Sequence, residues 1–234
     1  MTVPMVVTLD GPAGAGKSTV ARALAARLGL PYLETGAMYR AVAWFSLERG
    51  LDPKDPFQAE QAVRDCRLTL QRGTGTAVEV LVNGAPIGSE IRQPAVSLAA
   101  SQIAVHPVVR EQLVAWQRDF LRKHGGVLEG RDTGTHVAPD APFKFFLDAS
   151  LDVRVLRRRE QLLKLGREVA SELVEEEILE RDERDRSRAV APLVPALDAI
   201  RIDTSQLSSE QVVEQILQVI RSRCPTPLPT TGSQ

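Results

Sequence analysis

Apolar and polar positions near the start of the sequence change from a continuous apolar run to a helical spacing. The run Met5–Leu9 is rich in β-branched residues and ends before Gly11, which predicts a buried strand of a parallel sheet. The stretch Lys17–Leu28 has apolar residues at helical spacing and is followed by Gly29, which predicts a helix with a glycine stop. A strand, a glycine-rich loop and a helix are therefore expected in succession.

The rest of the chain repeats this alternation. Continuous apolar runs predict further buried strands at Gly126–Gly130, Phe143–Leu147 and Ala199–Asp203. Helical spacing predicts helices over residues 37–49, 94–105, 107–123, 151–165, 171–188 and 208–223. Because strands alternate with helices, we expect an α/β fold with a parallel sheet flanked by helices.

Residues 67–92 follow a different pattern. Apolar and polar residues alternate there with the period of a strand, and Asn83-Gly84 is a strong signal for a hairpin turn. We therefore expect a small antiparallel insert within the α/β core. Residues 224–234 are rich in Pro, Thr and Gly, which predicts a disordered tail.

Composition and charge restrict the class of protein. The chain has 234 residues, 43% hydrophobic and 25% charged, which suits one sizeable core with an insert. Its net charge of −1 gives no overall attraction to nucleic acid. No stretch resembles a signal peptide or a membrane span, and Cys66 and Cys224 do not resemble a disulfide framework. We therefore expect a soluble cytoplasmic protein that binds neither membrane nor nucleic acid.

The loop between the first strand and the first helix carries the candidate chemistry. Gly11 and Gly16, followed by Lys17 and Ser18, match the pattern G-x-x-x-x-G-K-[ST]. A flexible turn before an ordinary helix is the alternative, but the strand before the loop and the helix after it favour a phosphate-binding loop. Glycines let main-chain N–H groups surround phosphate oxygens, and the helix N-terminus adds positive charge. The expected nucleotide-binding residues are Gly11, Pro12, Ala13, Gly14, Ala15, Gly16, Lys17, Ser18 and Thr19.

The side chains of this loop have separate expected roles, but they do not identify the reaction. Lys17, expected on the solvent side, would reach the β and γ phosphates, and the Ser18 hydroxyl would bind Mg²⁺. A GTPase would need an N-K-x-D motif, yet Asn83 is the only asparagine of the chain. A motor or transporter ATPase would usually be larger. A small-molecule kinase would need a second anion site built from arginines.

Arginines follow two of the predicted strands. The segment "ETGAMYR" places Thr35 and Arg40 after a second strand, and "EGRDTGT" places Arg131 and Asp132 after Gly126–Gly130. Open α/β sheets bind ligands at the carboxyl ends of their strands. An isolated arginine there usually makes a surface ion pair, but two such strand ends beside a phosphate-binding loop favour an anion site.

The most strongly charged of the predicted helices, "SELVEEEILERDERDRSR", continues an apolar stripe with charges. Val174 and Ile178 begin the stripe, and Arg181, Asp185 and Arg188 continue it at helical spacing. A solvated helix held by ion pairs between successive turns is the alternative, but it does not explain charges on the apolar face. We therefore expect this face to border a polar crevice. The preceding helix adds four arginines, of which one or two on a mobile lid would suffice for catalysis: Arg154, Arg157, Arg158 and Arg159.

Together these segments resemble the bacterial cytidylate kinases, a family of nucleoside monophosphate kinases. The resemblance covers nearly the whole chain, from "TLDGPAGAGKST" to "SSEQVVEQI". It rests on the ordered segments "TGAMYR", "SEIR", "AASQIAVHPVVR", "EGRDTGT", "PDAPFKFFLDAS" and "ERDERDRSRAVAPL". It implies a P-loop kinase core at residues 1–66 and 106–223, a nucleoside-monophosphate-binding insert at 67–105 and a helical lid at about 157–188.

The resemblance also implies roles for individual residues. The residues that would bind the acceptor nucleotide are Thr35, Arg40, Ser101, Arg110, Arg131, Asp132, Arg181, Asp185 and Arg188. Among them, Ser101, Arg110 and Asp132 would read the cytosine base, with Asp132 accepting a hydrogen bond from the amino group that uracil lacks. Arg181 and Asp185 would contact the sugar, and the acceptor phosphate would be held by Arg40, Arg131 and Arg188. The catalytic residues would be Lys17, Arg131, Arg157, Arg158, Arg184 and Arg188, with Arg157, Arg158 and Arg184 on the lid.

The implied reaction is transfer of the γ-phosphoryl group of MgATP to CMP or dCMP, giving ADP and CDP or dCDP, in pyrimidine nucleotide metabolism. Mg²⁺ would be bound with ATP, and we expect a monomer. Two alternatives stay open: a kinase of UMP or shikimate on the same core, and a nucleotide-binding regulatory module without turnover. Glu34, Thr133 and His136 depart from the family pattern, which concerns local packing rather than the substrate.

Overall fold

The computed structural model describes residues 4–164 and 166–223. A five-stranded sheet at its centre has the strand order β2-β6-β1-β7-β8, and all adjacent strands are parallel. Its strands are β1 (Val6–Asp10), β2 (Tyr32–Glu34), β6 (Gly126–Gly130), β7 (Phe143–Asp148) and β8 (Ile200–Asp203). The predicted α/β fold with a parallel sheet is confirmed. The predicted tail at 224–234, and the last residue of the helix predicted at 151–165, lie outside the described residues.

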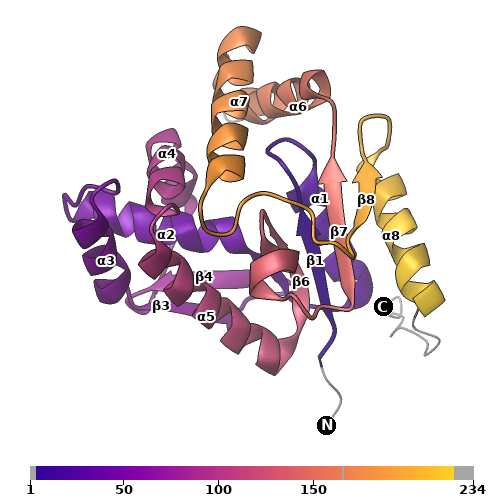
Figure 1. Cartoon of the computed structure of the whole chain (residues 1–234), viewed down its shortest axis with the longest axis horizontal. Helices are drawn as coiled ribbons and strands as arrows, with labels where there is room; N and C mark the ends of the chain where they lie inside the picture. Colours follow the sequence, from indigo (N-terminus) through magenta and orange to yellow (C-terminus); the bar gives the residue numbers. More distant parts are fainter. Residues whose placement is uncertain (1–3, 165, 224–234) are drawn as a thin grey trace.

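Helices cover both faces of this sheet, which is why its strands are short and apolar. In β6, Val127 and Leu128 are fully buried, and their side chains point to opposite faces. Leu128 belongs to one hydrophobic cluster with α2 (Thr35–Glu48), α4 (Pro94–Ile103) and α5 (Pro107–His124). Val127 belongs to a second cluster with α1 (Lys17–Leu28) and α8 (Ser209–Arg223). The sheet thus separates two hydrophobic cores, and Figure 1 shows the helices on either side of it.

The register of the central strand sets the place of the candidate site. Asp10, the last residue of β1, is level with Gly130 of β6 and Phe146 of β7. Because these strands are parallel, the loop after β1 and the segment after β6 leave the sheet side by side. The phosphate-binding loop and Arg131 therefore meet at the same edge.

The insert is a separate antiparallel sheet. It consists of β3 (Leu68–Arg72), β4 (Val78–Val82) and β5 (Ala85–Pro86), paired in chain order. Asn83 and Gly84 have φ values of 53° and 83°, as a tight hairpin turn with two positive φ angles requires. The predicted antiparallel insert and its hairpin turn are confirmed.

Three helical elements were not predicted from the sequence: α3 (Pro56–Asp65), the 3₁₀ helix η1 (Ser89–Arg92) and the π-helix η2 (Thr133–Val137). A local signal for α3 is present. The Asp55 side chain accepts hydrogen bonds from the N–H groups of Phe57 and Gln58, both at 2.9 Å, and Pro56 occupies the first helical position. No comparable pattern marks η2, whose geometry depends on contacts with a distant residue described below.

Two helices stand over the carboxyl edge of the sheet, at the top of Figure 1. They are α6 (Leu151–Lys164) and α7 (Ser171–Ser187), and both were predicted. They pack against each other through a small apolar cluster of their own, whose buried members are Val155, Leu162, Val174 and Ile178. We call α6 and α7 the lid helices.

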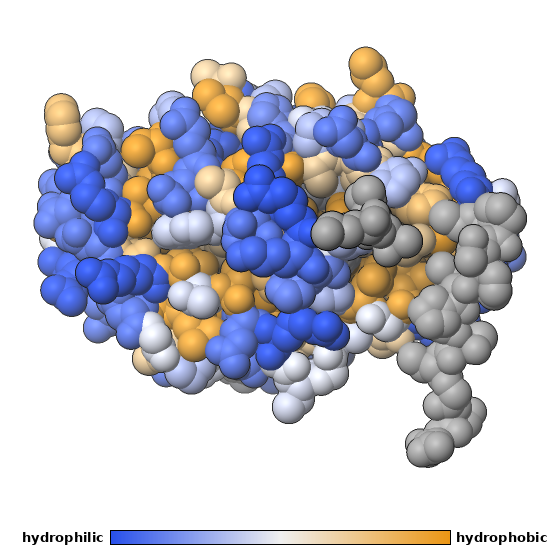
Figure 2. Space-filling model, turned by 90° about the horizontal axis from the view of Figure 1, so that it is seen from below, coloured by the Kyte–Doolittle hydropathy of each residue, from blue (hydrophilic) through white to orange (hydrophobic). Residues whose placement is uncertain are grey.

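The opposite face, at the amino ends of the strands, shows hydrophilic and apolar residues interspersed (Figure 2). Across residues 4–164 and 166–223, no helix combines the length and the apolar character needed to cross a membrane. The polar surface that carries the cavities described below lies at the carboxyl edge of the sheet, beneath the lid helices and opposite the face in Figure 2.

Candidate active site

The loop between β1 and α1 packs tightly against two neighbouring elements. Gly11, Gly14 and Gly16 have φ values of 146°, 78° and 86°, a region that favours glycine. A Cβ on Gly11 would lie 1.9 Å from the carbonyl oxygen of Leu147. One on Gly14 would lie 2.8 Å from the Cβ of Arg154. Both glycines are therefore required for the loop to sit against β7 and α6.

Lys17 folds back over this loop. Its Nζ donates a hydrogen bond to the carbonyl oxygen of Pro12 at 2.6 Å, and its side chain is buried. The expectation that Lys17 lies on the solvent side is therefore wrong, because residues of β6 and α7 line the same cavity and enclose it. Burial, together with the nearby charge of Arg131, lowers the pKa of Lys17 from 10.5 to about 7.

Ser18 lies against a buried carboxylate. Its hydroxyl donates to both carboxylate oxygens of Glu129, at 2.7 and 2.9 Å. The Tyr32 hydroxyl donates to Oε1 of Glu129 at 3.0 Å, and burial raises the pKa of Tyr32. Sequence reasoning missed Glu129. The available signal was a charged residue inside the otherwise apolar run Gly126–Gly130.

Asp10 is a second buried carboxylate that sequence reasoning missed. It accepts hydrogen bonds from the N–H and the Oγ1 of Thr133, both at 2.8 Å, and from the N–H of Gly134 at 2.7 Å. Burial raises the pKa of Asp10 to about 6. Because these donors begin η2, Asp10 fixes the segment that directly follows Asp132. The π-helix therefore depends on a contact between residues far apart in the chain.

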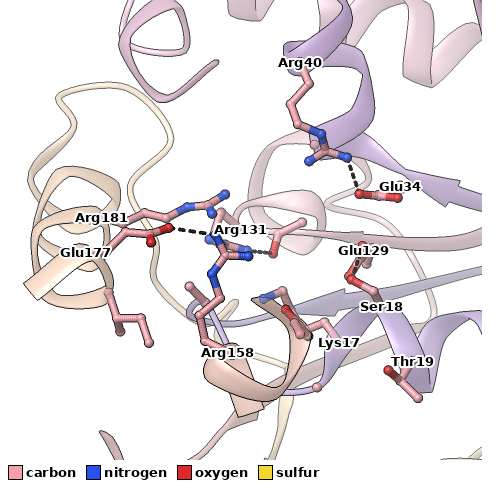
Figure 3. A pocket seen from close by; sticks show the side chains of 17 residues that line it. Lys17, Ser18, Thr19, Glu34, Arg40, Glu129, Arg131, Arg158, Glu177 and Arg181 are labelled. Carbon is pink, nitrogen blue, oxygen red and sulfur yellow. Dashed lines mark hydrogen bonds and ion pairs between the residues drawn. The ribbon is translucent and has the colours of Figure 1, made fainter. Parts of the chain in front are cut away.

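Three adjoining cavities lie along the carboxyl edge of the sheet. The central cavity, of about 180 Å³, is lined by the phosphate-binding loop and by side chains of α2, β6, α6 and α7 (Figure 3). The outer cavity, of about 370 Å³, lies between the loop, α6 and the segment after β8. The inner cavity, of about 80 Å³, lies between α2, α4 and α7.

These cavities share lining residues and so form one continuous row. The central and outer cavities share Gly14, Gly16, Thr19 and Gln161. The central and inner cavities share Gly36, Arg40, Arg131 and Arg181. A ligand that extends from the outer to the inner cavity would therefore pass the phosphate-binding loop and several arginines.

Two arginines of the central cavity are held by glutamates. Arg40 of α2 forms an ion pair with Glu34, at the end of β2. Arg158 of α6 donates through Nη2 to Oε1 of Glu177 on α7 at 2.8 Å (Figure 3). An anion in the central cavity would compete with both glutamates for these guanidinium groups.

Two further arginines come from β6 and α7. Arg131 donates through Nε to Oδ2 of Asp185 at 2.8 Å. Across residues 4–164 and 166–223, the Arg181 guanidinium makes no ion pair or hydrogen bond. Burial and the charge of Arg131 lower the pKa of Arg181 to about 10. Figure 3 shows Arg131 and Arg181 beside Lys17, so the cavity concentrates positive charge.

A buried ion pair lines the inner cavity. Arg110 of α5 donates through Nη2 to Oδ2 of Asp132, and the two side chains are 3% and 10% exposed. Ser101, Asp185 and Arg188 line the same cavity. The residues that the resemblance assigned to the cytosine base thus lie together. The charged face predicted for α7 does border a cavity, so this prediction is confirmed.

Arg157 lies in the outer cavity rather than the central one. Its Nη1 donates to Oγ1 of Thr204 at 2.9 Å, and its Nη2 donates to the Thr204 carbonyl oxygen at 2.7 Å. The Thr204 hydroxyl also approaches the carbonyl oxygens of Ala15 (3.2 Å) and Asp148 (3.0 Å). Arg157 is therefore held beside the phosphate-binding loop, on the side away from Arg131.

Most of the site residues expected from the sequence line these cavities. Four line none of them: Gly11, Pro12, Thr35 and Arg184. Gly11 and Pro12 shape the loop from beneath. The Thr35 hydroxyl donates to the main-chain oxygen of Glu129 at 2.8 Å, which fixes the start of α2 against β6.

Comparisons with known proteins cover nearly the whole chain. The family model for cytidylate kinase matches residues 7–222. A cytidylate kinase of Nitratidesulfovibrio vulgaris (strain Hildenborough) is 50% identical over 222 residues, 93% of each protein. A bifunctional pantoate ligase/cytidylate kinase of Synechococcus sp. (strain JA-2-3B'a(2-13)) is 48% identical over 218 residues, which are 92% of this chain but 40% of that protein.

The similarity to solved structures is more distant. A crystal structure of an uncharacterized protein from Eubacterium ventriosum matches with a TM-score of 0.52 at 13% identity, over 94% of this chain and 99% of that chain. This likeness indicates a shared fold. The family match and the high identity to a full-length relative show that the chain belongs to the cytidylate kinase family.

Proposed function

We propose that this chain transfers the γ-phosphoryl group of MgATP to CMP or dCMP, giving ADP and CDP or dCDP. The observation that carries the proposal is the row of cavities. A central cavity rich in cations adjoins a small inner cavity that is lined by the Arg110–Asp132 pair. Membership of the cytidylate kinase family supports a nucleoside monophosphate as the acceptor.

In this proposal the inner cavity selects the base. Asp132 uses Oδ2 for Arg110, and among the described residues nothing donates to its Oδ1. Oδ1 would accept a hydrogen bond from the amino group of cytosine, while Arg110 would donate to the ring. Uracil presents a carbonyl oxygen in place of the amino group and would meet the carboxylate with like polarity. An unpaired buried charge gives strong discrimination between two bases of the same shape.

The central cavity would hold the reacting phosphates. An oxygen of the acceptor phosphate attacks the γ phosphorus, the bond to the β–γ bridging oxygen breaks, and ADP leaves. The acceptor phosphate is already anionic, so no general base is needed. Lys17, Arg131 and Arg158 would neutralise charge on the transferring group, and Arg40 and Arg188 would orient the acceptor. Catalysis is thus positioning and charge neutralisation.

The residues around Ser18 fit a magnesium ion carried by the nucleotide. Mg²⁺ prefers hard oxygen ligands, and the Ser18 hydroxyl with the two Glu129 oxygens provides such a set. Ser18 would hold the ion, and Glu129 would orient the Ser18 hydroxyl. Such an ion would reduce the negative charge on the phosphates of the nucleotide.

The remaining assignments are parts of the same proposal. The donor base would occupy the outer cavity beside Arg157, and the lid helices would close over both nucleotides. The core at residues 1–66 and 106–223, the acceptor-binding insert at 67–105 and the lid at about 157–188 would act as separate functional regions. The chain would work as a monomer in the cytoplasm, in pyrimidine nucleotide metabolism and without nucleic acid or membrane partners. The balanced net charge of −1 is consistent with this setting.

A coupled assay of ADP release, with a panel of acceptors, tests the proposed function. CMP and dCMP are expected to support turnover, with UMP far weaker and shikimate inactive. A preference for UMP or shikimate would show that this compound, rather than CMP or dCMP, is the acceptor. Tight ATP binding without turnover on any acceptor would instead indicate a regulatory nucleotide-binding module.

A further inference from the structure

A pair of buried charges outside the row of cavities joins the lid helices to the phosphate-binding loop. Arg154 of α6 and Asp182 of α7 form an ion pair at 2.5 Å, and their side chains are 7% and 1% exposed. Neither residue lines the central, outer or inner cavity. The pair therefore acts on other parts of the protein rather than on a ligand in those cavities.

Both polar main-chain groups of Ala13 are bound by this pair. The Ala13 N–H donates to Oδ1 of Asp182 at 3.4 Å, and Nη1 of Arg154 donates to the Ala13 carbonyl oxygen at 3.2 Å. The next residue, Gly14, packs so closely on α6 that a Cβ there would lie 2.9 Å from the Arg154 carbonyl oxygen. The lid helices thus hold the phosphate-binding loop at Ala13 and Gly14, two residues that also line the central cavity.

Helix α7, which carries Asp182, also borders the inner cavity. On α7, Asp182 is flanked by Arg181 and Asp185, which both line the inner cavity. Asp185 is bound to Arg131, which follows β6. The apolar cluster shared by α6 and α7 makes the two helices pack as one body. A single packed unit therefore contacts the phosphate-binding loop on one side and the inner cavity on the other.

We propose that Arg154 and Asp182 are positioning residues that couple donor binding at the phosphate-binding loop to acceptor binding in the inner cavity. An acceptor that fixes α7 also fixes the Ala13 peptide, and a donor that orders the loop also orders α7. This inference rests on the proposed function, because it assigns donor phosphates to the loop and the acceptor to the inner cavity. By linkage, each ligand tightens the binding of the other by the same factor.

A purely structural role is the competing explanation, and substitution can separate the two. Asp182→Asn leaves Arg154 buried without its counter-ion and is expected to lower stability. Replacement of a whole buried ion pair by apolar residues of similar volume is often neutral or stabilising. The double variant Arg154→Met/Asp182→Leu therefore removes the contacts to Ala13 while preserving the packing of the lid helices.

The test measures binding of a non-hydrolysable ATP analogue with Mg²⁺, alone and with saturating CMP, by isothermal titration calorimetry. In the double variant we expect a melting temperature near that of the unmodified chain. The Kd for the analogue is expected to rise about tenfold or more, because contacts to a charged pair are lost. The ratio of the Kd values without and with CMP should fall toward one. Arg154→Lys, which keeps the charge but not the forked donor, should give an intermediate ratio.

Asp198→Asn is the matched control. It removes the partner of another buried cation, Lys144, at 2.7 Å, and neither residue lines the row of cavities. In this variant the ratio of the Kd values without and with CMP, the coupling ratio, should equal that of the unmodified chain.

Two results would overturn the inference: a coupling ratio of one in the unmodified chain, or an unchanged ratio and unchanged Kd in a folded double variant. If the double variant does not fold, the ratio in Arg154→Lys decides. An unmodified chain that binds the analogue but does not phosphorylate CMP would contradict the proposed function alone, since the Kd for the analogue still reports the contact with Ala13.

Discussion

Arg110 and Asp132, which both line the inner cavity, bind each other, and both side chains are nearly inaccessible to water. A change at either residue therefore affects the ion pair as well as any ligand. We expect Asp132→Asn to lower kcat/KM for CMP by about tenfold to a hundredfold, the cost of one hydrogen bond to a charged group. UMP should lose less, because it offers no amino donor to the carboxylate. Steady-state kinetics with both acceptors measure the change.

The same variant should also lower the melting temperature, because Arg110 is left buried without its counter-ion. Asp119→Asn, at a half-exposed surface carboxylate paired with Lys123 at 2.7 Å, is the control and should change neither property much. An equal loss of activity toward CMP and UMP would argue against base reading by Asp132. It would instead indicate that the pair positions the neighbouring Arg131.

We expect Lys17 to be essential for turnover but to destabilise the protein when no ligand is bound. Its pKa is about 7 in the folded chain, against 10.5 without the fold. Between these pH values the unfolded chain binds a proton that the folded chain does not, so the free energy of unfolding rises with pH. Below pH 7 the buried charge is fully unfavourable. Lys17→Met should therefore raise the melting temperature of the ligand-free protein below pH 7, with a gain that shrinks toward pH 10.5.

Thermal denaturation over this pH range, without nucleotide, measures the effect, and a coupled assay should show that turnover falls by orders of magnitude. Lys123→Met, at an exposed surface lysine, is the control and should leave the pH dependence unchanged. A Lys17→Met protein that is less stable at every pH would show that the lysine is not strained by burial.

Glu129 is expected to set the requirement for magnesium. Its carboxylate accepts from Ser18 and from Tyr32. Glu129→Gln removes the charge that orients the Ser18 hydroxyl, so the Mg²⁺ concentration for half-maximal rate should rise several-fold. Tyr32→Phe removes one hydrogen bond to the same carboxylate but keeps its charge, and should have a much smaller effect. Magnesium titrations of the initial rate distinguish the two, and equal effects would assign Glu129 to packing rather than to the ion.

Gly14 is expected to tolerate no side chain. Gly14→Ala places a Cβ 2.8 Å from the Cβ of Arg154 and keeps a positive φ, so the loop must move. We expect a large loss of activity and a lower melting temperature. Gly29→Ala is the control, because Gly29 also has a positive φ but nothing lies within 4 Å of its Cβ position. That variant should lose only about 1–2 kcal/mol of stability, through the backbone alone, and keep its activity.

The alternation of apolar runs and helical spacing was enough to predict the sheet, most helices and the hairpin at Asn83 and Gly84. These features depend on residues that lie close together along the chain, so their pattern can be read from the sequence. The charged face of α7 could be predicted for the same reason, since Arg181 and Asp185 follow Val174 and Ile178 at helical spacing and Arg188 comes directly after the helix.

The features that could not be predicted depend on contacts between distant parts of the chain. The π-helix η2 forms because Asp10 accepts hydrogen bonds from Thr133 and Gly134, more than a hundred residues later. The position of Arg157 likewise depends on Thr204. Lys17 was expected at the solvent side because the motif shows what the lysine binds but not which elements enclose it. Such enclosure follows from the packing of α7 over the sheet.

Because cations crowd the central cavity, the stability of the folded protein depends on whether a ligand is bound there. Lys17 and Arg181 lie among other positive charges, and burial together with the charge of Arg131 lowers the pKa of both. Any polyphosphate that enters the cavity relieves this repulsion and stabilises only the folded state, by about 2.7 kcal/mol at a hundred times its Kd. When nucleotide is scarce, a larger fraction of the protein would then be unfolded, and proteases that degrade unfolded chains would remove it faster. Its resistance to proteolysis would thus depend on how much of the central cavity is occupied by nucleotide.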